Sequence, residues 1–125
     1  MKEETKEWID RAEQDYRVAK RESRVIDEPS YSAVCFHAQQ CAEKYLKAYL
    51  QEKGIEIVKT HDLVFLLDRI LSVQPLWSVY RQMLERLNNY AVDTRYPGEE
   101  ITKEEAMQAV NFMAEIRKAI SDEIR

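Results

Sequence analysis

The sequence contains few of the residues that interrupt regular structure. Only two glycines and three prolines occur in 125 residues, so we expect few turns and long uninterrupted helices. No hydrophobic run of roughly 18 residues is present, and no segment has the apolar core of a signal peptide. These absences predict a cytoplasmic protein without a membrane segment.

Residues that commonly hold metals or form disulfides are also scarce. The two cysteines, Cys35 and Cys41, fall on one predicted helix, where six residues separate them by about 240° and about 9 Å. They cannot pair without breaking that helix, which favours a reduced environment. The two cysteines and the two histidines are not spaced as the ligands of a zinc finger are. The sequence also contains no glycine-rich phosphate loop. We expect no metal site and no cofactor.

The overall composition is that of an ordinary soluble domain. Hydrophobic residues make up 45% and charged residues 34%, and the length suits a single domain spanning residues 1–125. A formal net charge of −4 argues against a broad surface that coats nucleic acid, although it permits local contacts.

Helical periodicity recurs along the whole chain. Ser30 can cap one helix, Gly54 suits the position after its end, Thr60 can cap a short helix, and Thr102 with Glu105 forms a capping box. The predicted helices cover about residues 5–23, 31–53, 61–71, 75–90 and 103 onward. The predicted fold is all-α, an up-and-down antiparallel bundle of four main helices plus one short helix.

The second predicted helix is apolar over an unusually wide arc of roughly 200°. A surface helix usually shows a stripe of about 100° or a little more. We therefore expect burial on two sides, by the domain's own core and by a partner subunit in a homodimer. The arc contains Val34, Cys35, Ala38, Cys41, Ala42, Tyr45, Leu46, Ala48, Tyr49 and Leu50.

The remaining arc of this helix is polar. It holds Glu43, Lys47, Gln40, Lys44 and His37. One interpretation is a solvated face with Gln40–Lys44 and Glu43–Lys47 pairs at i,i+4 spacing. That interpretation leaves Phe36 unexplained, because it falls in the middle of the polar arc, where it could cover a partner or another helix.

Two further segments carry candidate chemistry. His37 and His61 could each act as acid or base, or could simply complete the structure, since no nucleophile motif accompanies them. In the segment 93–97, Arg95 suits phosphate and Tyr96 can stack on a base. The alternative is a local Asp93–Arg95 pair with Tyr96 packed on the bundle.

Four pieces of the sequence together resemble one family. They are Ala12, Asp15, Tyr16 and Ala19; Gln40-x-x-Glu43-Lys44-x-Leu46-Lys47-Ala48; Thr60-His61-Asp62-Leu63; and Asp93-x-Arg95-Tyr96-Pro97. Because these four pieces occur in this order, the chain resembles a HEPN domain of the short, stand-alone prokaryotic type. The resemblance implies a helical bundle that forms a homodimer with a cleft. It also implies a minimal nucleotidyltransferase partner in a two-component, toxin–antitoxin-like system, with a nucleotide or the partner's substrate as ligand.

Many HEPN branches are metal-independent ribonucleases with an Arg followed, after four to six residues, by a His. That motif is absent here, because the nearest arginine before either histidine is Arg24, too far from both. We therefore expect a protein that is not an enzyme.

The favoured hypothesis is a non-catalytic module that binds a nucleotide, RNA or a nucleotidyltransferase. Lys47 and Arg95 would meet phosphate, Tyr96 would stack, and Glu43 would orient a cation. The predicted ligand-binding residues are Gln40, Glu43, Lys47, His61, Arg95 and Tyr96. Two alternatives stay open: a ribonuclease with a non-standard pair of His37 or His61 with Arg95, and a ligand-free structural or interaction dimer.

Overall fold

A computed structural model describes residues 1–91 and 96–124. Within these residues the secondary structure is entirely helical, which confirms the predicted all-α bundle. The elements are α1 (Glu3–Ser23), α2 (Tyr31–Glu52), the short α3 (Leu63–Ile70), the 3₁₀ helix η1 (Pro75–Tyr80), α4 (Arg81–Tyr90) and α5 (Lys103–Ile124).

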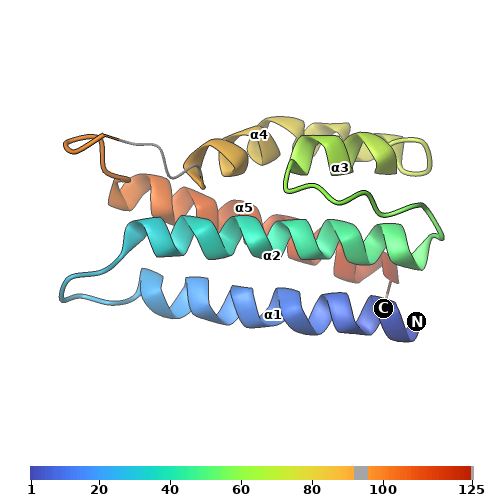
Figure 1. The fold of residues 1–125 in the computed structure, drawn as a ribbon, viewed down its shortest axis with the longest axis horizontal. Coiled ribbons are helices and arrows are strands. Elements are labelled where there is room, and N and C mark those ends of the chain that lie inside the picture. The colour runs from blue at the N-terminus through green and yellow to red at the C-terminus, as the bar shows by residue number, and fades with distance from the viewer. Residues whose placement is uncertain (92–95, 125) are drawn as a thin grey trace.

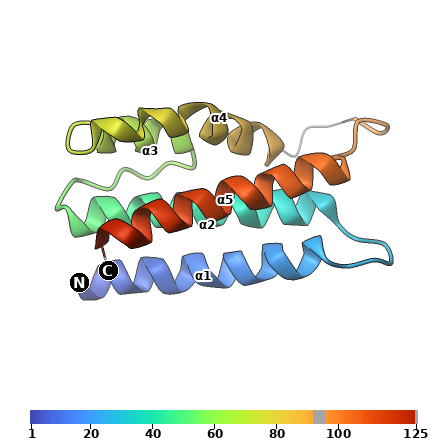
Figure 2. The same cartoon turned by 180° about the vertical axis from the view of Figure 1, so that it is seen from behind.

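The main helices α1, α2, α4 and α5 run alternately up and down, and α2 lies at the centre (Figures 1 and 2). Helix α2 packs against α1, α3, α4 and α5. The start of α1 and the end of α5 lie at the same end of the bundle, whereas the α1–α2 connection lies at the other end. No described helix is both long enough and apolar enough to cross a membrane.

The chain itself covers the wide apolar arc of α2. All ten of its residues are buried, as expected for a helix with neighbours on several sides. The inference that a partner subunit covers part of this arc is therefore wrong. The homodimer stays a prediction, but the arc no longer supports it.

Local sequence signals account for several of the helix ends. Ser30 Oγ accepts a hydrogen bond from the Ala33 amide at the start of α2. Gly54 follows α2 with a φ of 69°, a conformation that suits glycine. The Thr102 amide donates to Glu105 Oε1 and the Glu105 amide donates to Thr102 Oγ1, which confirms the predicted capping box.

Two helix starts differ from the prediction. Asp62, not Thr60, caps α3, because its carboxylate accepts from the amides of Val64 and Phe65. The helix expected from Pro75 begins as the 3₁₀ helix η1, and α-helical geometry starts only at Arg81. Trp77 of η1 is buried against Tyr49, with ring centroids 4.7 Å apart. The residue that packs on the core thus lies within the tighter 3₁₀ segment.

Candidate functional site

The buried carboxylate of Glu43 on α2 contacts two other predicted ligand-binding residues. Glu43 Oε2 lies 2.9 Å from the Lys47 ammonium, and Glu43 Oε1 lies 2.8 Å from Nδ1 of His61. The side chains of Glu43 and Lys47 are only 4% and 8% exposed, whereas that of His61 is 82% exposed. We call Glu43, Lys47 and His61 the Glu43 cluster.

The positions of these side chains follow from local structure. The i,i+4 spacing places Glu43 and Lys47 one helical turn apart, and the Trp8 ring of α1 covers the Lys47 ammonium at 5.5 Å. His61 immediately precedes the Asp62 cap of α3. Its carbonyl accepts a hydrogen bond from Gln39 Nε2 at 2.8 Å, which ties the connector to α2.

Gln40 reaches the Glu43 cluster indirectly. Its Nε2 donates to Gln39 Oε1 at 2.9 Å, and Gln39 in turn holds the backbone of His61. The structure therefore brings four of the six predicted residues into one neighbourhood. Lys47 is matched by Glu43 and covered by Trp8, so a phosphate could contact it only if one of these side chains moved.

A second carboxylate–histidine pair joins α1 to α2. Asp15 Oδ1 lies 2.8 Å from Nδ1 of His37, and Asp15 Oδ2 accepts from the Lys44 ammonium at 2.5 Å. Asp15 is buried, and the side chains of His37 and Lys44 are partly exposed. In both pairs a ring with its proton on Nδ1 donates to the carboxylate and leaves Nε2 as an acceptor.

The polar arc of α2 is not the solvated face with only local pairs that one interpretation expected. The Glu43–Lys47 pair forms, but it is buried, and Lys44 pairs with Asp15 of α1 instead of Gln40. Sequence reasoning did not assign Asp15, Gln39, Lys44 and Trp8 to the site. Asp15 carried a usable signal, because it lies in the middle of the apolar face of α1, where a carboxylate requires a partner.

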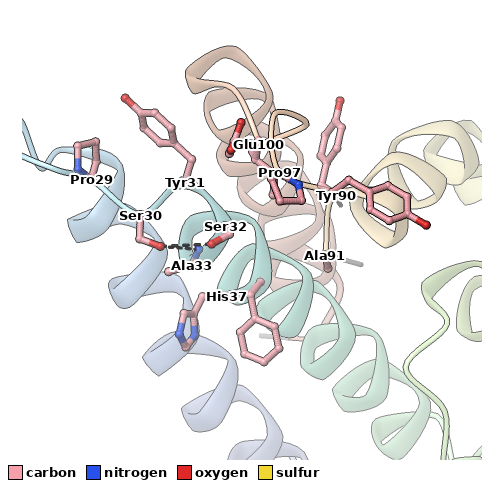
Figure 3. Close-up of a pocket in the computed structure, with 13 residues that line it drawn as sticks. Pro29, Ser30, Tyr31, Ser32, Ala33, His37, Tyr90, Ala91, Pro97 and Glu100 are labelled. Atoms are coloured by element: carbon pink, nitrogen blue, oxygen red, sulfur yellow. Dashed lines mark hydrogen bonds between the residues drawn. The ribbon is translucent and has the colours of Figure 1, made fainter. Parts of the chain in front are cut away.

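Tyr96 lies elsewhere, at the end of the bundle where α1 connects to α2. Its side chain is 74% exposed and lines a pocket that also contains Phe36 and His37. Figure 3 shows this pocket, with Tyr31 and Tyr90 on opposite sides and His37 on the α2 side. The predicted Arg95, and the alternative Asp93–Arg95 pair, lie outside the described residues.

No group of three or more potential metal ligands occurs within residues 1–91 and 96–124. In each of the two carboxylate–histidine pairs, a lysine ammonium also lies against the carboxylate and neutralises it. These arrangements are suited to orienting a histidine ring.

The fold and this geometry can be compared with known proteins. The family model for the HEPN domain matches residues 5–124. The chain belongs to the HEPN domain family. No curated protein matches the chain.

Two solved structures resemble this HEPN domain over its length. ST0689, described as an archaeal HEPN homologue, has 28% sequence identity and a TM-score of 0.78, with 100% of both chains covered. TT1696 from Thermus thermophilus has a TM-score of 0.80, covering 94% of this chain and 96% of that chain. Its identity is 23%, so that likeness concerns the fold alone.

Two of the four sequence pieces that resemble HEPN domains lie together in the structure. The piece containing Gln40, Glu43 and Lys47 lies on α2, and the piece containing His61 leads into α3. They meet at the Glu43 carboxylate. These two pieces of the HEPN resemblance thus form one connected polar cluster.

Proposed function

We propose that this HEPN domain is a non-catalytic module that binds a nucleotide or RNA. We further propose that it acts as a homodimer with a minimal nucleotidyltransferase partner in a two-component, toxin–antitoxin-like system. The observation that carries the proposal is the exposed His61 ring held by the buried Glu43 carboxylate.

The geometry supports a division of roles within the predicted set. His61 and Gln40 would contact the ligand, because His61 is exposed and Gln40, which is linked to the His61 backbone through Gln39, is partly exposed. Glu43 would fix the ring of His61, and Lys47 would balance the charge of Glu43. A ring held in one orientation loses little freedom on binding, which favours recognition. We assign phosphate contact to Arg95. We assign stacking to Tyr96, which lies apart from the Glu43 cluster and would therefore meet a different part of the ligand.

The absence of the Arg-x₄₋₆-His motif supports a binding role without catalysis. Cleavage of RNA needs groups that move the 2′-hydroxyl proton and stabilise the phosphate together. Here both lysines of the carboxylate–histidine pairs are already matched by carboxylates, so neither offers an unpaired charge to a phosphate.

Calorimetric titration of the full chain with AMP, ATP and short single-stranded RNAs tests ligand binding. We expect saturable binding that weakens in His61→Ala and in Arg95→Ala. Lys118→Ala serves as the control, because Lys118 is exposed and pairs only locally with Asp122 on α5. Absence of saturable binding for every nucleotide and RNA would favour the ligand-free structural dimer instead.

The partner and the oligomeric state need separate experiments. Co-expression with a minimal nucleotidyltransferase encoded beside this gene should give a complex that survives size-exclusion chromatography. Light scattering of the chain alone at micromolar concentration should give the mass of a dimer. A monomer in that measurement contradicts the homodimer without affecting the nucleotide titrations.

The carboxylate–histidine pairs favour one second candidate, a ribonuclease with a non-standard site. Each pair holds a histidine ring against a carboxylate through Nδ1, an arrangement that acid–base catalysis uses. Cleavage of a mixed RNA pool by the parent, reduced in His37→Ala, His61→Ala or Arg95→Ala, would establish it. An inactive parent protein would eliminate this candidate.

A further inference from the structure

The pocket that contains Tyr96 is large enough for a small organic ligand. Its volume is about 980 Å³, at the upper end of the range typical of ligand sites. The start of α2 forms one side, and the end of α4 with the segment before α5 forms the other (Figure 3). It is distinct from the Glu43 cluster, whose members do not line it.

Aromatic rings line this pocket from several segments. Tyr31 and Phe36 come from α2, Tyr90 ends α4, and Tyr96 precedes α5. Phe36 is 49% exposed and Tyr96 is 74% exposed, although large aromatic rings usually gain from burial. Exposed rings around one hollow are suited to stacking on a planar ligand.

His37 adds an oriented polar group to the aromatic wall. Asp15 holds its Nδ1 at 2.8 Å, and its ring meets Phe36 edge to face with centroids 5.2 Å apart. Asp15 is buried and its other carboxylate oxygen binds Lys44, so both oxygens of the carboxylate that orients His37 are held in place. The Nε2 atom of His37 is then the ring's remaining hydrogen-bonding position.

The described lining contains no cation of fixed charge. Its charged or titratable side chains other than tyrosine are His37 and Glu100. Glu100 accepts from the Gly98 amide, and such backbone hydrogen bonds lower the pKa of its carboxyl, so it is ionised at neutral pH. A negative carboxylate disfavours a phosphate inside the pocket and tolerates an uncharged ring with N–H donors.

We propose that this pocket takes the base of a nucleotide or of single-stranded RNA, stacked on Phe36 and Tyr96 and hydrogen-bonded by His37. The phosphate points outward, away from Glu100. This proposal rests on the proposed nucleotide-binding function and specifies which part of the ligand the chain recognises. It also explains the exposed Phe36 that the sequence left unaccounted for.

Titration of the full chain with adenosine, uridine, AMP and ribose 5-phosphate tests this placement. We expect at least one nucleoside to bind, its nucleotide to bind more tightly through the phosphate contact assigned to Arg95, and ribose 5-phosphate to bind far more weakly than either. Recognition through the base also predicts little loss of nucleoside affinity between 50 and 300 mM salt, roughly less than twofold, because no counterion release accompanies it.

Phe36→Ala and Tyr96→Ala should each weaken nucleoside binding by about tenfold, the range expected for loss of one stacking ring. Leu76→Ala is the matched control, since Leu76 is an exposed apolar residue of η1 that does not line the pocket. Phe36→Tyr, which keeps a ring, should retain binding. Circular dichroism establishes that each variant is folded.

Two results would overturn the base pocket while leaving nucleotide binding intact. One is binding of ribose 5-phosphate as tight as that of AMP. The other is unchanged AMP affinity in Phe36→Ala and Tyr96→Ala combined with loss in His61→Ala, which would place the ligand at the Glu43 cluster. Absence of binding by any nucleoside, nucleotide or RNA would instead contradict the proposed function itself.

Discussion

The Nδ1 atom of His61 lies 2.8 Å from Oε1 of Glu43, so a ring exposed to solvent is fixed by a carboxylate that is almost fully buried. The same carboxylate holds the Lys47 ammonium at its other oxygen. One side chain therefore both neutralises the buried Lys47 ammonium and orients His61.

Replacing Glu43 with alanine should destabilise the domain strongly. The change leaves the Lys47 ammonium buried beneath Trp8 without its counter-charge, and breaking such a pair typically costs about 3–5 kcal/mol. Urea unfolding measures this loss. Asp122→Ala, which removes the acid of an exposed i,i+4 pair, is the control and should leave the unfolding midpoint nearly unchanged. A Glu43→Ala variant as stable as the control would show that the pair is not buried as described.

Asp15→Ala should also destabilise the domain, though less than Glu43→Ala. Asp15 binds His37 and Lys44, both of which remain partly exposed and can be solvated when the carboxylate is removed. We expect a loss of about 1–3 kcal/mol, the cost of removing a buried hydrogen-bonding partner. Thermal unfolding compares this variant with Asp10→Ala, an exposed acid of the same helix. Equal effects of the two substitutions would contradict the pairing.

The start of α3 offers a comparison between two neighbouring polar residues. Asp62→Ala should cost about 1 kcal/mol, because Asp62 caps the amides of Val64 and Phe65 and accepts from Asn88. Thr60→Ala should cost less, since Thr60 Oγ1 accepts only from the exposed Asp62 amide. Denaturant unfolding of both variants tests the order, and a larger effect at Thr60 would restore the capping predicted from the sequence.

The two cysteines should be unreactive in the folded protein. Both are buried thiols that are not in a disulfide, and burial raises the pKa of the Cys41 thiol well above its ordinary value, with Glu13 and Asp15 adding to the rise. Because the thiolate is the reactive form, labelling with a disulfide reagent at pH 8 should be slow in buffer. It should become rapid and involve both thiols in concentrated urea. Immediate labelling of the native chain would contradict their burial.

The raised pKa of Cys41 also makes the stability of the domain depend on pH. The thiol holds its proton more tightly in the folded protein than in the unfolded chain. The contribution of Cys41 to the free energy of unfolding is therefore complete below the pKa of the unfolded thiol. It falls as the pH rises above the ordinary value near 9.0, where the unfolded thiol ionises first. Cys41→Ala should therefore show less alkaline loss of stability than the parent, measured by unfolding between pH 8 and pH 10.

Periodicity and capping predicted the fold because these signals are local. Ser30, Gly54 and the Thr102–Glu105 box each act within one turn of a helix end, and each occupies its expected position. The start of α3 was less predictable, because Asp62 gains an additional partner from the distant Asn88. The apolar arc of α2 was misleading since its width reflects contact with four other helices of the same chain.

The candidate site was only partly predictable for a different reason. Glu43 and Lys47 are separated by one turn, so their pairing follows from helix geometry. The contacts from His61 to Glu43 and from Asp15 to His37 cross between elements, and spacing along the sequence does not give the relative rotation of two helices. The position of Asp15 within an apolar face was the remaining clue.

The arrangement of the chain ends has a practical consequence. Because α1 starts and α5 finishes at one end of the bundle (Figure 1), a group joined to either terminus is attached at the end opposite the pocket that contains Tyr96. The protein can thus be tethered to a sensor chip or fused to a fluorescent reporter through either terminus. Such a tether would leave open the surface on which the nucleoside experiments depend.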